Sequence, residues 1–114
     1  MTNLDKEARI KKEVRRLKAV FKDLDQNKLK TVDALIKRAA FITVSLEDLE
    51  DELNETGWTE VYTNGKNQEG VKKSAAAEAH ISLTKNLNAI MKQLLDLVPP
   101  AQKKGSKLQE LMSS

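Results

Sequence analysis

Residues 32–53, VDALIKRAAFITVSLEDLEDEL, contain apolar residues that recur at alternating steps of three and four. This spacing places them along one side of an α-helix and predicts a continuous apolar seam. Such a helix extends about 33 Å at ~1.5 Å per residue, and it needs a packed partner to stay folded in water. The residues that we expect in this core or oligomer seam are Val32, Leu35, Ala39, Ile42, Leu46, Leu49 and Leu53.

Two further segments, one on each side of this stretch, carry the same helical period. The first lies before residue 26, and the second ends at Pro99-Pro100, which cannot continue a helix. Long helices joined by short connections pack antiparallel. The predicted fold class is therefore all-α: an antiparallel helical hairpin or bundle with coiled-coil-like seams and an irregular loop between the second and third helices. We expect the three long helices near residues 4–26, 30–56 and 74–98.

The composition limits both the size of the core and the chemistry available. Hydrophobic residues make up 39% of the 114 residues and aromatic residues 4%, so the core is thin and self-association is expected. The absence of Cys excludes disulfides and thiolate chemistry. The N-terminal residues are charged and no apolar run approaches membrane-spanning length, so we expect a cytosolic protein without a membrane partner. We divide the chain into a folded domain, residues 1–100, and a polar tail, residues 101–114.

Charge is segregated along the chain. Residues 1–30 carry ten basic and five acidic side chains, whereas residues 31–60 carry two basic and eight acidic side chains. The first predicted helix is basic on both sides of its apolar seam, and such a face is typical of a surface that contacts phosphates. The candidate DNA-binding residues of this helix are Arg9, Lys11, Lys12, Arg15, Arg16, Lys18 and Lys22.

Ion pairing with carboxylates is a second interpretation of this basic face. Six carboxylates lie between Glu47 and Glu55, where they oppose the dipole at the end of the second predicted helix. A short link from Asp25 to Lys30 would lay this acidic end beside the start of the first helix. Phosphate contact and internal or inter-subunit pairing both remain open, and they can coexist on different sides of the helix.

The segment between the second and third predicted helices lacks a helical period. Its first apolar residues, Trp58, Val61 and Tyr62, are expected to pack down on the domain. Asn64-Gly65 is a turn signal, but the next residues show no apolar alternation, so we expect an irregular loop, with a small β-hairpin at this turn as the weaker alternative. Lysines near two glycines suit close approach to a phosphate backbone, with a solvated loop as the alternative. These further DNA-binding candidates are Lys66, Lys72 and Lys73.

The single histidine, His80, lies on the seam of the third predicted helix. A metal site is not expected because there is no Cys and no second His, and no nucleophile or carboxylate pair accompanies it. We interpret His80 as a half-buried packing residue near the start of the helix. The sequence also lacks a glycine-rich phosphate-binding motif, and it indicates no catalytic residue, no cofactor and no small-molecule substrate.

Several segments of the chain resemble the small terminase subunits of tailed phages. The most distinctive is the run Asn-Gly-x-Asn-Gln-x-Gly-x-Lys-Lys-Ser over residues 64–74. The likeness covers roughly residues 5–100, almost the whole predicted domain. Supporting residues lie at positions 27–29, 32–41, 46–49, 57, 62, 85, 92–94 and 99.

Members of this family are not enzymes; they assemble into rings, recognise the phage genome, and recruit or regulate a large subunit that holds the ATPase and the nuclease. The resemblance therefore implies a homo-oligomeric ring with two partners, double-stranded viral DNA and the large terminase subunit. It also implies a location in the cytoplasm of an infected bacterial host. The alternative is a helical protein-interaction or scaffold module that does not bind DNA.

Overall fold

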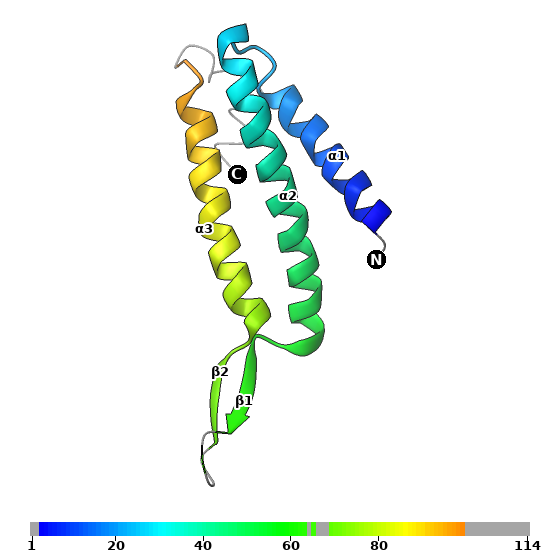
Figure 1. Ribbon diagram of the computed structural model, residues 1–114, viewed down its shortest axis with the longest axis vertical. Coiled ribbons are helices and arrows are strands. Elements are labelled where there is room, and N and C mark those ends of the chain that lie inside the picture. Colours follow the sequence, from blue (N-terminus) through cyan, green and yellow to red (C-terminus); the bar gives the residue numbers. More distant parts are fainter. Residues whose placement is uncertain (1–2, 64, 66–68, 100–114) are drawn as a thin grey trace.

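The computed structural model describes residues 3–63, 65 and 69–99. Most of these residues form three helices: α1 (Asn3–Val20), α2 (Gln26–Thr56) and α3 (Ala75–Asp96). Helices α2 and α3 run antiparallel side by side, and α1 turns back along α2 and diverges from it toward the N-terminus (Figure 1). The prediction of a mostly helical fold is therefore confirmed. Within the described ranges, no helix is both long enough and apolar enough to cross a membrane.

The predicted irregular loop between the second and third helices is wrong, and with it the purely all-α class. β1 (Thr59–Thr63) and β2 (Glu69–Lys73) form a two-stranded antiparallel sheet that projects beyond the α2–α3 pair (Figure 1). β1 is rich in β-branched residues, which favour strands. Gly65 supplies a positive φ of 71° between the strands. β2 carries one large apolar residue, so its strand conformation comes from pairing with β1 rather than from a pattern of its own.

The boundary between the first two helices also differs from the prediction. α1 ends at Val20 instead of near residue 26, and α2 begins at Gln26 instead of near residue 30. The reason for the early start is an N-cap, because the Asp25 side chain accepts a hydrogen bond from the backbone N–H of Asn27 at 2.7 Å. Residues 21–25, which the prediction placed at the end of the first helix, therefore form a turn, and Asp25 at its end is the N-cap of α2.

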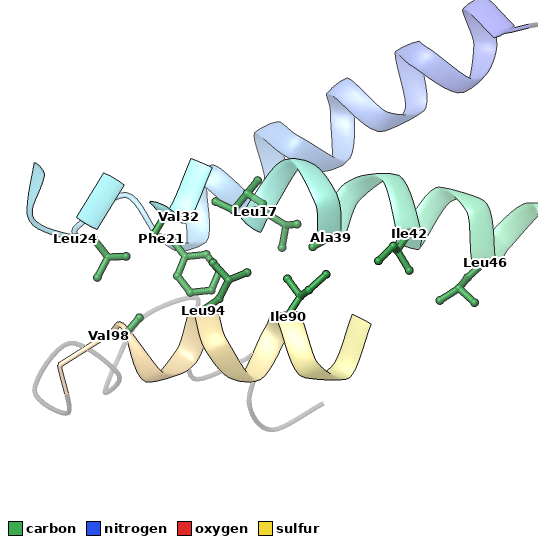
Figure 2. Close-up of a cluster of buried hydrophobic side chains, with 11 residues drawn as sticks. Leu17, Phe21, Leu24, Val32, Ala39, Ile42, Leu46, Ile90, Leu94 and Val98 are labelled. Atoms are coloured by element: carbon green, nitrogen blue, oxygen red, sulfur yellow. The ribbon is translucent and has the colours of Figure 1, made fainter. Parts of the chain in front are cut away.

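The core lies where the α1–α2 turn meets the C-terminal half of α3 (Figure 2). Leu17 enters it from the end of α1, Phe21 enters it from the turn just after α1, and Leu94 enters it from α3. Within the α2 seam, Leu35 and Leu49 are half-buried and the other five residues are buried. Full burial of a Leu or Phe side chain contributes about 1.5–3 kcal/mol. The main buried cluster consists of Leu17, Phe21, Leu24, Val32, Ile36, Ala39, Ile42, Leu46, Ile90, Leu94 and Val98.

The hairpin end of the molecule is much less covered. Val61 is 69% exposed and Val71 is 68% exposed, and Trp58 and Tyr62 are exposed as well. The prediction that Trp58, Val61 and Tyr62 pack down on the domain is therefore wrong. The sheet that carries Val61 and Tyr62 extends away from the helices instead of folding back on them (Figure 1), and Trp58 meets α3 through an edge-on contact with the His80 ring.

Candidate nucleic-acid interface

Helix α1 presents basic side chains on its outer face because its apolar residues face α2. Leu17 is almost fully buried and Val14 packs against the same core. Arg9 is half-buried, and the other basic candidates of this segment are exposed: Lys11, Lys12, Arg15, Arg16 and Lys18 in α1, and Lys22 in the turn just after it. Four of them form no ion pair within the described part of the chain, and we call these the open cations: Lys11, Lys12, Arg15 and Lys22.

Arg9, in contrast, binds the acidic end of α2. Its guanidinium lies 2.6 Å from Asp48 Oδ1 and 3.7 Å from Glu47 Oε2. The hydrogen bond to Asp48 raises the pKa of Arg9 above its ordinary value. For Arg9, the geometry corresponds to the internal-pairing interpretation of the basic face.

Two more of the candidate DNA-binding residues, Lys18 and Arg16, form ion pairs with carboxylates of α2 and α1 respectively. Lys18 Nζ lies 3.0 Å from one carboxylate oxygen of Asp33, and Lys37 Nζ lies 3.0 Å from the other. Hydrogen bonds from Lys37 and Lys18 lower the pKa of Asp33. Arg16 Nε donates to Glu13 Oε1 at 3.0 Å, and this hydrogen bond raises the pKa of Arg16. Pairing between α1 and α2 therefore uses Asp33 at the core end as well as the acidic end.

Most of the acidic end of α2 faces solvent. Glu50 is exposed and its Oε2 lies 2.9 Å from His80 Nε2 on α3. Glu52 and Glu55 are also exposed, and neither forms an ion pair among residues 3–63, 65 and 69–99. Arg9 of α1 contacts the first two carboxylates of this segment, Glu47 and Asp48, and α1 diverges from α2 toward its N-terminus (Figure 1). The internal pairing thus uses part of each charged block.

The hairpin lysines lie apart from the outer face of α1. The hairpin projects from the end of the α2–α3 pair opposite the α1–α2 turn (Figure 1). Lys72 Nζ is 3.4 Å from Glu60 Oε1 and 5.8 Å from the centroid of the Tyr62 ring. Lys73 is exposed and stands opposite Thr59 in the sheet. Lys66 lies outside the described residues.

His80 packs near the start of α3. Besides its contact with Glu50, its ring meets the Trp58 ring edge-on, with 5.3 Å between the centroids and 75° between the planes. The side chain is 20% exposed, so the prediction that His80 is half-buried is confirmed. In the part of the chain that the structure describes, no group of three or more His, Cys, Asp or Glu side chains is arranged to hold a metal ion.

Two cation contacts were missed by reasoning from the sequence. Lys28 Nζ donates to the carbonyl oxygen of Leu97 at 3.1 Å, just past the end of α3. Lys6 Nζ lies 4.8 Å from the centroid of Phe41, a residue that is 51% exposed on α2. A cation near a helix C-terminus is favourable, but only the tertiary arrangement shows which helix end lies beside which lysine.

The comparisons with known proteins do not identify a relative. No protein-family model matches the chain. No curated protein matches its sequence, and no solved structure matches its fold. The functional argument therefore depends on the residues of this chain and on their geometry.

Proposed function

We propose that this protein is a non-enzymatic small terminase subunit of a tailed phage. In this role it forms a homo-oligomeric ring, binds double-stranded viral DNA, and recruits or regulates the large terminase subunit during genome packaging in the cytoplasm of the host. The resemblance over residues 64–74 supports the family, and the elongated helical protomer, 62 × 31 × 23 Å, offers long sides for repeated contacts.

The open cations, three in α1 and Lys22 in the turn after it, are the observation that carries the DNA-binding part of the proposal. Lys11 and Arg15 are one helical turn apart, about 6 Å at ~1.5 Å per residue. Phosphates of one strand recur about every 3.4 Å along the axis of B-DNA, so this pair spans about two phosphates. Each phosphate that a cation neutralises releases counterions, which adds affinity independently of the base sequence.

A charge-reversal experiment tests this assignment. In the variant Lys11→Glu/Arg15→Glu, we expect weaker binding to duplexes of unrelated sequence by a similar factor, and a salt dependence that is flatter by about two units in the log–log slope. Binding is measured by titration over a series of salt concentrations. The number of subunits in the assembly is measured in parallel by native mass determination. It should equal that of the parent, because neither residue pairs with another described side chain.

Lys85→Glu/Lys92→Glu is the matched control, because it makes the same change in net charge at two exposed positions of α3. This control should keep the parental salt slope. A parent whose affinity does not depend on salt, or an α1 variant that binds DNA as tightly as the parent with the same slope, contradicts the role of the open cations. A parent that assembles but binds no duplex at all leaves the helical scaffold module as the function.

A further inference from the structure

A groove opens on the surface where the end of α1 meets the start of α2. Its volume is about 460 Å³, within the range of about 300–1,000 Å³ that is typical of ligand-binding clefts. Three of its lining residues, Phe21, Val32 and Ile36, belong to the main buried cluster. Leu29 also lines the groove and is 37% exposed, so the groove offers apolar surface to solvent. This end of the molecule lies opposite the hairpin (Figure 1).

Lysines surround this apolar lining. Lys18, Lys22 and Lys30 line the groove, and all three are exposed. Lys22 and Lys30 form no ion pair within the described part of the chain. Asp33 is the single carboxylate among the described lining residues, and Lys18 and Lys37 already bind it. The groove therefore combines a surplus of positive charge with apolar surface.

This combination suits a ligand that is both apolar and anionic. The aliphatic stem of a lysine packs along apolar surface while its ammonium group stays in water, so one occupant can contact the stems, Leu29 and the charged groups together. A phosphate backbone supplies negative charge but no apolar side chain to cover Leu29. An acidic peptide supplies both, because a helix can carry Leu or Phe on one side and Glu or Asp on the other. Charge complementarity and the apolar lining together favour the peptide.

We propose that the groove binds an acidic amphipathic segment of a partner protein, with an apolar side chain against Leu29 and carboxylates beside Lys22 and Lys30. Docking of an amphipathic helix into a groove is a common mode of peptide recognition. Complementary charge speeds the encounter and disfavours basic segments. The inference goes beyond the proposed function, since Leu29 and Lys30 are not among the DNA-binding candidates. Lys22 is an open cation, so the test leaves it unchanged.

Binding of a fluorescein-labelled synthetic peptide to the full chain tests the inference, with fluorescence anisotropy as the measurement. The probe is EELFEELLEE, whose Leu and Phe residues fall on one side of a helix and whose Glu residues fall on the other. One control peptide, EESSEESSEE, lacks the apolar residues, and a second, KKLFKKLLKK, reverses the charge. The parent protein should bind the probe and neither control peptide, because the groove needs both properties in its ligand.

Variants of the groove locate the binding. Leu29→Ser/Lys30→Glu removes the exposed apolar residue and reverses one charge, and it should weaken binding of the probe by about tenfold or more. Lys30→Glu alone keeps every apolar residue and should weaken binding by about threefold or more. The matched control Ile81→Ser/Lys92→Glu makes the same two changes on α3, where Ile81 is 39% exposed and Lys92 is exposed, and it should bind like the parent. Far-UV circular dichroism should show equal helix content in all four proteins.

Several results would overturn the inference. A parent that does not bind the probe has a groove that is covered by its own tail, residues 101–114, or by a second copy of the chain. Equal binding of the serine peptide would show that charge alone explains the affinity. A groove variant with the parental affinity for the probe places the binding elsewhere. A groove variant that loses duplex binding but keeps the probe makes the groove part of the DNA interface.

Discussion

The two ends of the α2–α3 pair use apolar side chains in opposite ways. At the α1–α2 turn three helices meet, and Phe21 is 2% exposed. At the other end only two helices and the hairpin remain, and Val71 is 68% exposed. The difference shows that one end holds the core that folds the chain, whereas the other end presents apolar surface to solvent. Exposed apolar surface at a strand edge is typical of a contact between molecules.

The largest effect that we expect distinguishes these two ends. Phe21→Ala should lower the free energy of unfolding by about 3–5 kcal/mol, because it removes a buried ring and leaves a cavity in the main cluster. Val71→Ala, at the hairpin end, should change it by about 0.5 kcal/mol or less in chains kept monomeric by dilution. Both values come from denaturant titrations. Equal losses for the two variants would contradict the division into a core end and a contact end.

The core end could be predicted from the sequence, and the hairpin could not. Helical periodicity is a local signal, so the three seams indicated three helices and their approximate ranges. The strand conformation of β2 arises from hydrogen bonds with β1, a non-local partner, and the run EGVKK carries no alternation that reveals it. The hairpin points away from the helices, and this direction depends on how α2 ends and α3 begins. The sequences of the two strands therefore do not predict it.

A smaller effect is expected where the hairpin joins α3. Ser74 is buried, its hydroxyl accepts a hydrogen bond from the N–H of Ala77 at 3.1 Å, and its own N–H donates to the carbonyl of Trp58 at 3.0 Å. Ser74→Ala removes the cap and should cost about 1 kcal/mol in the free energy of unfolding. Ser82→Ala is the control, at an exposed position within α3 where Ala favours the helix, and it should cause no loss.

This second comparison is also measured by denaturant titration. If Ser74→Ala costs no more than Ser82→Ala, the cap does not fix the start of α3. If the loss approaches that of Phe21→Ala, the junction belongs to the core, and the contrast between the two ends is smaller than the exposed fractions indicate.

The sequence predicted which side of the first helix is basic, but it did not predict the ion-pair partner of each basic residue. The sequence placed seven cations around the outside of α1, because their positions relative to the apolar seam follow from helical geometry. It did not show that Arg9 meets Asp48 or that Lys18 meets Asp33. Those pairs depend on where α1 crosses α2 and on how α1 diverges, which packing of the core decides. The open cations are the basic residues that this packing leaves without an ion pair in the described part of the chain.

The smallest effect that we expect concerns Asp33, which ties α1 to α2 at the core end. Hydrogen bonds from Lys37 and Lys18 lower its pKa in the folded state below the ordinary value of 3.8. The ionised carboxylate therefore stabilises the folded state above that ordinary value, and this contribution is lost as the pH falls through the lowered pKa. Both lysines are more than half exposed, so solvent and salt screen the pair and its contribution is modest.

Asp33→Asn should consequently lower the free energy of unfolding at neutral pH, and the gap between parent and variant should close as the pH falls below the lowered pKa of Asp33. The measurement is a series of denaturant titrations from about pH 7 to about pH 2 at low salt. Glu52→Gln is the control, because Glu52 is exposed at the other end of α2 and forms no ion pair with a described residue. Its gap to the parent should stay small at every pH. A gap for Asp33→Asn that is unchanged in acid would show that the loss comes from packing rather than from charge, and the core end would then depend on apolar contacts alone.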